Sequence, residues 1–344
     1  MFGKKVTAGL DIGQDSVKCA TSLSDKYLVR DMRLCATMAD RQTRDQLASR
    51  EELIRCVNEL VKVCQKEVPG FGKHVSASVQ GSGSVARYLE LPLLKPKELS
   101  VAVNSQASKY VPFPLKDMTL SFVNVPQLST AKKKSAVFFI AEQNETLEEL
   151  KAIMKATGLN LNRIETPVLS LSRLFALNHR FPKDEFFAII HMGFRYSFFI
   201  VLRDRYPYFV RELSISGRDF TYALQMGGQC SWREAEETKL KYDVLAKETA
   251  IEPFITRWLD DVKRSIEFFV KQFPGENFDI KKIFITGGTA AMKNLDLRLS
   301  SFIALPVESD RWDRIKRSGV QGEGSAEGDD GFSTFSVAMG LTFD

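Results

Sequence analysis

The spacing of hydrophobic positions predicts alternating strands and helices along this chain. Val6–Ile12 is an apolar run that leads into Gly13, which is typical of a buried strand ending in a turn, and a second strand is predicted near Ser16–Ser22. Over Arg50–Glu67 the apolar residues recur every three or four positions, so they fall on one face of a helix. The pattern therefore predicts an α/β fold.

The strand-turn-strand pattern of the N-terminus returns in the second half of the chain. Phe186–His191 predicts an apolar strand, Met192-Gly193 a turn, and Tyr196–Leu202 a returning strand. Two such units about half the chain apart indicate an internal duplication. Three helices are predicted after the second unit, over Gly217–Met226, Ser231–Tyr242 and Pro253–Phe273.

The segment between the two units has a pattern of its own. Pro69–Gly72 end the first helix, and a further helix is predicted from Lys97 to about Tyr110. Val111–Pro114 is predicted to be extended, because a residue before proline avoids the helical conformation. Near the C-terminus, Ser318–Gly331 is rich in glycine and acidic residues without apolar periodicity, which predicts a surface loop.

Composition narrows the class of protein. The 344 residues are 44% hydrophobic and 26% charged, which is typical of a globular chain of about two domains. The net charge of +5 argues against dedicated nucleic-acid binding, and the basic tip Ala131–Lys134 is read as a solvated turn rather than a nucleic-acid contact. Five cysteines without a C-x-x-C pair favour reduced thiols over structural zinc. No apolar run is long enough to cross a bilayer and no secretory signal is evident, so a cytoplasmic location is expected.

Three short motifs could carry chemistry. The turn that begins at Asp11 could hold phosphate oxygens on its backbone N–H groups, and Asp11 could position Mg²⁺ through water. Gly287-Gly288-Thr289, after a predicted strand, could bring backbone close to a nucleotide. Glu236 and Lys239 share a helix face and could hold a ribose and base. Taken singly, each motif also fits a structural role without a ligand. The Asp11 turn could be only a tight turn, Gly287–Thr289 a packing turn, and Glu236 and Lys239 a solvated surface pair.

The order of these motifs is more specific than any one of them. Two glycine hairpins, a helical region with Glu236 and Lys239, and then a strand-Gly-Gly turn follow one another in the order of the actin-like nucleotide-binding fold. That fold has two duplicated RNase H-like lobes around a nucleotide cleft.

Nearly the whole chain resembles the PilM family of type IV pilus assembly proteins. Gly9–Gly13 with Ser16–Lys18 is similar to the family's first phosphate loop, and Lys109–Leu115 is the most diagnostic match. Further resemblances are Tyr88–Pro92, Glu165–Pro167, Ser216–Thr221, Glu234–Lys239, Ile285–Thr289 and Ala338–Leu341.

The resemblance implies an actin-like ATPase fold with an inserted subdomain of the type found in FtsA and PilM. Residues 1–72 and 166–185 would form the core of the first lobe, and 73–165 the inserted, partner-binding subdomain. Residues 186–216 and 276–344 would form the core of the second lobe, and 217–275 its helical subdomain. The residues implied to bind ATP are Asp11, Gly13, Gln14, Ser16, Lys18, Gly193, Arg195, Gly217, Glu236, Lys239, Gly287, Gly288 and Thr289.

The second phosphate loop departs from the family pattern. It normally begins Asp-x-Gly, whereas this chain reads His191-Met192-Gly193-Phe194-Arg195-Tyr196. Imidazole in place of the carboxylate removes a candidate ligand for metal-bound water, and Phe194 and Tyr196 are expected to crowd the γ-phosphate. Arg195 could compensate by contacting phosphate directly. We therefore expect ATP binding that is weakened or independent of Mg²⁺, with slow or absent hydrolysis.

The resemblance also implies a partner. The family binds the N-terminal cytoplasmic tail of the membrane protein PilN, and Tyr110, Val111, Pro112 and Phe113 are the candidate contacts. Through PilN and PilO the chain would link the inner-membrane platform to the pilus motor ATPases that drive twitching motility. Its membrane association would be only through partners, and self-association is left open.

Three alternatives share the actin-like core. One is the cytoplasmic part of a GspL-like type II secretion protein, although the family continues into a transmembrane helix. Another is an FtsA-like division protein, which usually ends in a basic amphipathic helix. A sugar or acetate kinase would need a carboxylate near the γ-phosphate, where this chain has His191.

Overall fold

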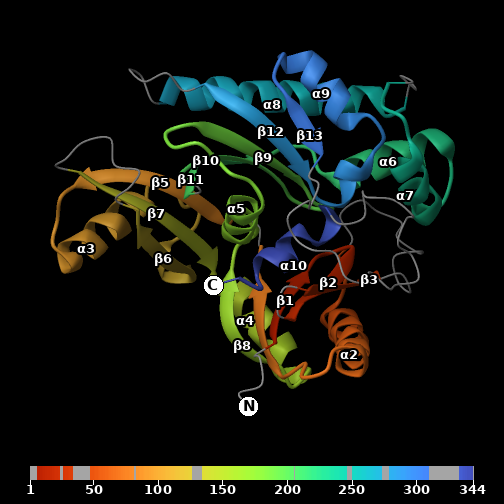
Figure 1. Ribbon diagram of the computed structural model, residues 1–344, viewed down its shortest axis with the longest axis horizontal. Coiled ribbons are helices and arrows are strands. Elements are labelled where there is room, and N and C mark those ends of the chain that lie inside the picture. Colours follow the sequence, from red (N-terminus) through yellow and green to blue (C-terminus); the bar gives the residue numbers. More distant parts are fainter. Residues whose placement is uncertain are drawn as a thin grey trace.

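The computed structural model describes residues 6–23, 26–33, 47–80, 83–125, 134–204, 206–245, 250–272, 279–309 and 333–343. Within them the chain forms two lobes, each built on a five-stranded sheet, and a smaller three-stranded sheet beside them (Figure 1). Two helices, α5 (Pro167–Asn178) and α10 (Ser336–Gly340), lie between the two large sheets (Figure 1).

The first large sheet has the strand order β3-β2-β1-β4-β8. β1 pairs antiparallel with β2, and β2 with β3, whereas β1–β4 and β4–β8 are parallel pairs. The strands are β1 (Thr7–Ile12), β2 (Ser16–Leu23), β3 (Lys26–Arg33), β4 (His74–Ser78) and β8 (Asn160–Glu165).

The second large sheet repeats this topology in the order β11-β10-β9-β12-β13. Its first three strands are antiparallel, and β12 runs parallel to both β9 and β13. The strands are β9 (Phe186–Met192), β10 (Ser197–Arg203), β11 (Tyr206–Leu213), β12 (Ile280–Thr286) and β13 (Val307–Ser309). The same order and the same directions in both sheets confirm the internal duplication.

The helices of the first lobe are α2 (Arg50–Glu67) and α4 (Asn144–Ala156), which pack against each other and the first sheet. α2 has the bounds predicted from its apolar spacing. Its start is set by a capping box, in which Ser49 Oγ accepts the Glu52 N–H and the Glu52 carboxylate accepts the Ser49 N–H at 2.7 Å.

The second lobe carries the longer set of helices: α6 (Gly217–Gly228), α7 (Trp232–Lys241), α8 (Glu252–Gln272), α9 (Leu295–Ile303) and the 3₁₀ turn η3 (Gly288–Ala291). The aromatic side chains of Trp258 and Phe269 on α8 are fully buried and belong to the core. The three predicted helices are confirmed, while Phe273 and the predicted loop Ser318–Gly331 lie outside the described residues. Of the basic tip, only Lys134 is described, and it pairs with Glu90 at 2.9 Å.

The third sheet is antiparallel, in the order β5-β7-β6, and has its own hydrophobic core. It comprises β5 (Val85–Pro92), β6 (Met118–Asn124) and β7 (Lys134–Gln143), with α3 (Pro96–Ala107) and the 3₁₀ turn η1 (Leu115–Asp117). The predicted bounds of the inserted subdomain, 73 and 165, are too wide. β4 and β8 pair within the first sheet and α4 packs on α2, so the separate unit runs from β5 to β7.

The C-terminal helix α10 returns to the first lobe and packs on β1 and α5. A Cβ atom on Gly9 would lie 2.1 Å from the Ala338 carbonyl oxygen, and one on Gly340 would lie 2.1 Å from that of Ser170. Arg173 donates to the Gly340 carbonyl at 3.0 Å and holds Glu165 through both carboxylate oxygens. These contacts require glycine at both positions and connect the end of the chain to its beginning.

We expect Gly340→Ala to lower the free energy of unfolding by about 1–3 kcal/mol, because the added methyl meets backbone that cannot move aside. Without that clash, alanine would stabilise a helix by up to about 1 kcal/mol relative to glycine, so the sign is diagnostic. Urea denaturation measures the change. Gly72→Ala is the control, since a Cβ there has no neighbour within 4 Å; equal stability of the two variants would contradict the prediction.

Candidate nucleotide cleft

Each large sheet carries an equivalent glycine hairpin, and the charges of Asp11 and Lys18 on the first hairpin reach His191 beside the second. In the β1–β2 turn the Gly13 N–H donates to the Ser16 carbonyl at 3.1 Å, and in the β9–β10 turn the Gly193 N–H donates to the Tyr196 carbonyl at 3.1 Å. A Cβ atom would lie 2.9 Å from the carbonyl oxygen in the first turn and 2.6 Å in the second. Both glycines are therefore needed for the turns themselves.

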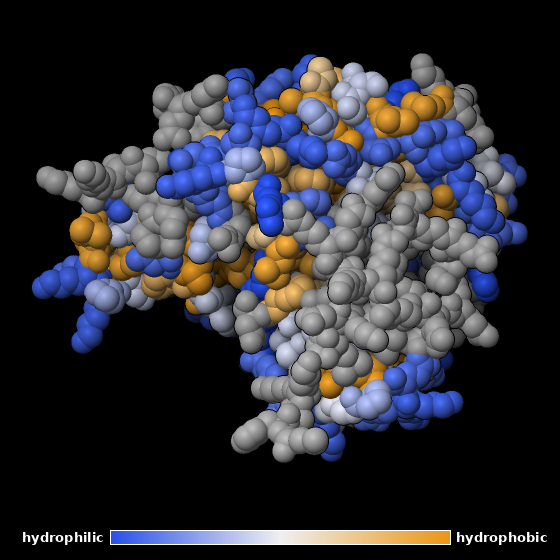
Figure 2. Space-filling model, in the orientation of Figure 1, coloured by the Kyte–Doolittle hydropathy of each residue, from blue (hydrophilic) through white to orange (hydrophobic). Residues whose placement is uncertain are grey.

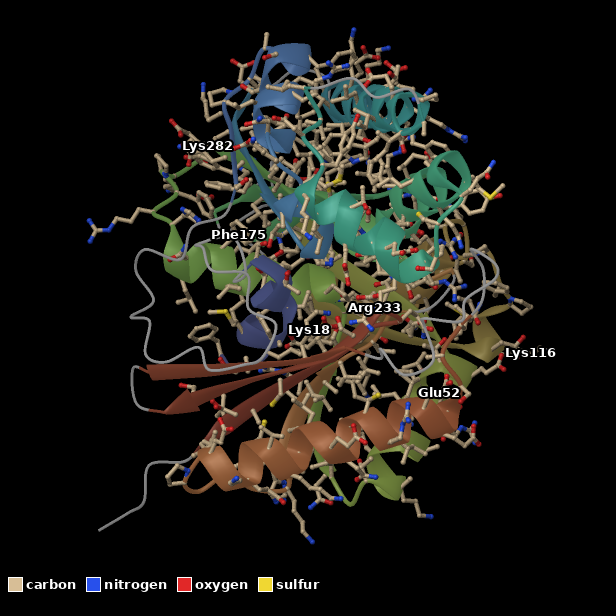
Figure 3. The ribbon with its side chains drawn as sticks, turned by 90° about the vertical axis from the view of Figure 1, so that its right-hand side faces the viewer. Lys18, Glu52, Lys116, Phe175, Arg233 and Lys282 are labelled. Carbon is tan, nitrogen blue, oxygen red and sulfur yellow. The ribbon has the colours of Figure 1, made fainter. Side chains whose placement is uncertain are left out.

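The first hairpin carries an ion pair between neighbouring strands. Asp11 and Lys18 are directly opposite each other, and the Lys18 Nζ lies 3.4 Å from the Asp11 Oδ2. Lys18 lies on the side of the first sheet that faces the second lobe (Figure 3). Ser16 is buried, and the Gln14 Oε1 accepts the Ala48 N–H at 3.2 Å, which ties the turn to the segment before α2. The carboxylate predicted to position Mg²⁺ is thus neutralised by a lysine.

His191 stands at the end of β9, facing the first hairpin. Burial lowers the pKa of its imidazole to about 4; the charge of Asp11 opposes this shift and that of Lys18 adds to it. Its Nε2 lies 3.3 Å from where a Cβ on Gly193 would be, and its Nδ1 is buried with no hydrogen-bond partner in the described parts of the chain. The imidazole is therefore neutral at physiological pH and packs over the second turn.

The second hairpin is held by the start of α6. The N–H groups of Gly217 and Arg218 donate to the carbonyls of Gly193 and Phe194, at 2.9 and 2.8 Å. The first turn of a helix usually has free N–H groups that can bind an anion. Here two of them are used by the hairpin.

The predicted nucleotide-binding glycines Gly217 and Gly287 also approach this hairpin closely. Gly287 has φ +99°, and a Cβ on it would lie 2.5 Å from the Met192 carbonyl oxygen. A Cβ on Gly217 would lie 2.2 Å from the Thr289 Oγ1. Thr289 is buried, and Gly288 begins the 3₁₀ turn η3. The structure therefore brings together the predicted residues of the second lobe.

The two aromatic residues of the second loop turn to different sides. The Phe194 ring meets the ring of Trp232 edge-on, with centroids 6.0 Å apart. The Arg195 guanidinium lies 5.4 Å from the Tyr196 ring centre, and burial raises the pKa of the Tyr196 hydroxyl. Trp232 was not singled out from the sequence, although it is an apolar residue at the start of an otherwise highly charged helix. It fixes the loop against α7.

Glu236 and Lys239 form a buried cluster between α6 and α7. The Lys239 Nζ lies 2.6 and 2.8 Å from the two Glu236 oxygens and 3.1 Å from the Thr221 Oγ1, and only 1% of its side chain is exposed. The alternative of a solvated surface pair is therefore wrong. All three ammonium protons of Lys239 have acceptors within the protein, so a role in holding ribose stays a prediction.

The predicted partner segment divides into core and surface residues. Val111 is buried in the core of the third sheet. Tyr110 is 46% exposed, with the Arg87 guanidinium 5.9 Å from its ring centre, and Phe113 is 40% exposed and lies over Gly83. Hydrophobic residues are visible on the surface of this subdomain (Figure 2). Tyr110 and Phe113 can therefore offer contact area, as can the exposed Pro112, whereas Val111 cannot.

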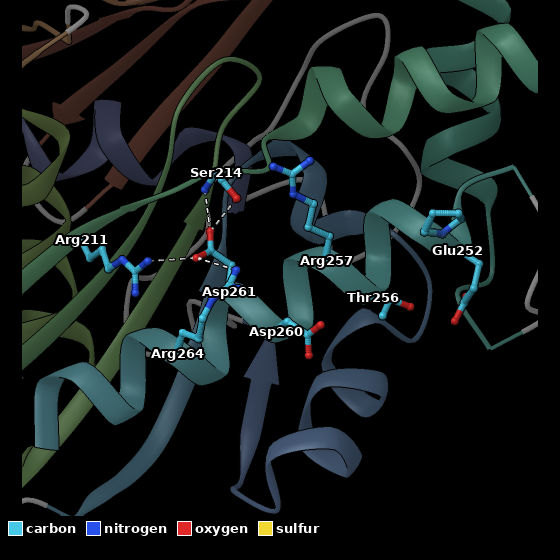
Figure 4. Close-up of a pocket in the computed structure, with 9 residues that line it drawn as sticks. Arg211, Ser214, Glu252, Thr256, Arg257, Asp260, Asp261 and Arg264 are labelled. Atoms are coloured by element: carbon cyan, nitrogen blue, oxygen red, sulfur yellow. Dashed lines mark hydrogen bonds and ion pairs between the residues drawn. The ribbon is translucent and has the colours of Figure 1, made fainter. Parts of the chain in front are cut away.

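A surface hollow of about 870 Å³ lies beside α8, around Asp261 (Figure 4). The buried carboxylate accepts the Ser214 N–H at 2.6 Å, the Ser214 hydroxyl at 2.9 Å and an Arg211 N–H at 3.2 Å. Its oxygens are thus engaged by the protein. The contact between Asp261 and Ser214 fixes the segment that leads from β11 into α6. None of the predicted site residues lines the hollow.

Glu236→Ala should lower the free energy of unfolding by about 3–5 kcal/mol, because it leaves the Lys239 ammonium buried without its carboxylate. Urea denaturation measures the loss. The matched control is Glu237→Ala on the same helix, whose pair with Arg233 is exposed on both sides and should contribute less than about 1 kcal/mol. Equal effects of the two substitutions would mean that the buried cluster does not stabilise the lobe.

His191 should make stability depend on pH between its folded pKa of about 4 and its ordinary value of 6.5. In that window the unfolded chain binds a proton that the folded imidazole does not, so stability rises with pH and is then constant above 6.5. The full contribution is at most about 3 kcal/mol. His191→Gln should remove this slope from unfolding curves recorded at pH 4 to 7. The exposed control His74→Gln should keep it, and a slope unchanged by His191→Gln would contradict the assignment.

The fold is shared with several actin-like proteins of known structure. A chain of a "PilM-PilN type IV pilus biogenesis complex" matches with a TM-score of 0.80 and 23% identity, over 98% of this chain and 97% of that one. The ethanolamine utilization protein EutJ from Carboxydothermus hydrogenoformans matches with a TM-score of 0.58 and 10% identity, over 98% and 89%. MreB5 of Spiroplasma citri bound to ADP matches with a TM-score of 0.53 and 11% identity, over 97% and 95%. The predicted actin-like fold is confirmed.

The described helices bear on membrane insertion, and a family model bears on the identity of the chain. Among the described helices none is both long and apolar enough to cross a membrane. The family model for the type IV pilus assembly protein PilM matches residues 9–316, which include both hairpins, the third sheet and the strand-Gly-Gly turn. This chain belongs to the PilM family of type IV pilus assembly proteins.

Proposed function

We propose that this chain is a cytoplasmic scaffold of type IV pilus assembly that binds the N-terminal cytoplasmic tail of PilN. The observation that carries the proposal is the third sheet, a subdomain with its own core that presents Tyr110 and Phe113 on its surface. Family membership supports it, as does the likeness to a protein solved in a PilM–PilN complex. PilN would bring the chain to the inner membrane.

The chemistry of the surface suits a short peptide. Exposed aromatic rings give a peptide apolar anchors at a low cost in side-chain entropy. The Arg87 guanidinium beside Tyr110 has a pKa lowered by burial and by the charge of Arg211, and it donates to the Val210 carbonyl on β11. Arg87 therefore connects the partner-binding subdomain to the second lobe. Through PilN and PilO the scaffold would reach the pilus motor ATPases.

We propose further that the cleft binds ATP weakly and hydrolyses it slowly or not at all. Glycine turns approach one another where the fold places a nucleotide, and Lys18 supplies a cation there. Two N–H groups of α6 are already used, and Lys239 is enclosed by Glu236 and Thr221. A nucleotide would have to displace some of these contacts, which lowers its affinity.

Calorimetry with a synthetic peptide of the N-terminal residues of PilN from the same genome tests the scaffold role. We expect saturable one-to-one binding, with and without ATP. Tyr110→Ala and Phe113→Ala should each weaken it about tenfold or more, which is typical of aromatic anchors.

Val123→Ala is the matched control, because Val123 is 48% exposed on the same sheet but lies outside the predicted partner segment. It should leave the affinity unchanged. No binding by the native chain would overturn the proposed scaffold role, while native binding that neither aromatic substitution affects would move the peptide to another surface.

A further inference from the structure

The two hairpins bring the Asp11–Lys18 ion pair near the neutral imidazole of His191. Asp11 and Lys18 come from the first lobe and His191 from the second, close enough that both charges act on the imidazole. This is where the fold would place the phosphates of a nucleotide and their Mg²⁺. The residues present can therefore be tested against the needs of that ion.

The charges and ligand types here do not suit Mg²⁺. The ion prefers oxygen ligands and keeps several waters, usually held by one or two carboxylates together with substrate phosphates. Asp11 is the carboxylate predicted to position the ion, and the Lys18 Nζ pairs with it at 3.4 Å. His191 supplies nitrogen, which suits softer transition metals better than Mg²⁺. No group of three or more metal-ligating side chains occurs anywhere in the described ranges.

The same residues can meet a phosphate without a metal. The Lys18 ammonium has three protons, and one of them suffices for Asp11. The buried Nδ1 of His191 has no hydrogen-bond partner in the part of the chain that the structure describes, and a buried polar atom is normally paired. Lys18 therefore retains N–H groups for an anion, and His191 carries a polar atom at the second hairpin that is unpaired within the described residues.

We infer that any nucleotide bound in this cleft is held without Mg²⁺, with Lys18 as its counter-charge and His191 as the residue that excludes the metal. The inference rests on the proposed binding of ATP and deepens it, because it names the form in which the ligand is bound. It assigns the exclusion of the metal to one side chain of the departing loop, His191.

Calorimetry with ATP, in Mg²⁺ buffer and again in excess EDTA, tests the inference on the full chain. The native protein should show affinities that agree within about twofold. His191→Asp restores a carboxylate beside Asp11, and its affinity should become at least about tenfold higher in Mg²⁺ than in EDTA, the range in which residues around a metal change its binding. His74→Asp makes the same chemical change at the exposed first residue of β4 and should behave as the native protein.

Each result of the ATP titrations either supports or overturns the inference of Mg²⁺-free binding. Native binding that Mg²⁺ strengthens about tenfold overturns the inference, and this measurement needs no variant to fold. If the native chain binds no ATP in either buffer, a Mg²⁺-dependent affinity gained by His191→Asp supports the role of His191, and no gain in a folded variant overturns it. Binding of the PilN peptide is measured separately, so failure here leaves the scaffold proposal standing.

Discussion

The close approach of α10 to β1 and α5 is the constraint on which the rest of the architecture depends. At Gly9 and Gly340 backbone meets backbone with no space for a side chain. Because α10 follows the last strand of the second sheet, this contact brings the second lobe onto the first. Arg173 reinforces this contact, because its guanidinium binds the Glu165 carboxylate and the Gly340 carbonyl together. The positions of the two hairpins relative to each other follow from this junction.

The second hairpin and the helices beside it are held by contacts of the protein with itself. The second turn bonds to α6, Phe194 packs on Trp232, and Lys239 is enclosed with Glu236. Such contacts hold the turns in shape without a ligand.

The subdomain formed by the third sheet contacts both lobes. Its strands are continuous in sequence with β4 and α4 of the first lobe, while Arg87 and Tyr88 contact Val210 and Tyr208 on β11 of the second. The two tyrosine rings stack with centroids 4.4 Å apart. Arg87 contacts both Tyr110 and the Val210 carbonyl, so it would join a peptide bound at Tyr110 to the second lobe.

The sequence by itself determined the predicted elements and their repetition, because apolar spacing and glycine turns are local properties of the chain. The family was predicted from the resemblance of its short motifs. α2 and the hairpins at Gly13 and Gly193 were predictable for that reason. Only the tertiary structure decided that β4 and β8 belong to the first sheet, that Val111 is core, and that Lys239 is enclosed. These outcomes depend on which distant segments meet. Strand pairing and burial are set by contacts between residues far apart in the chain, which no local pattern contains.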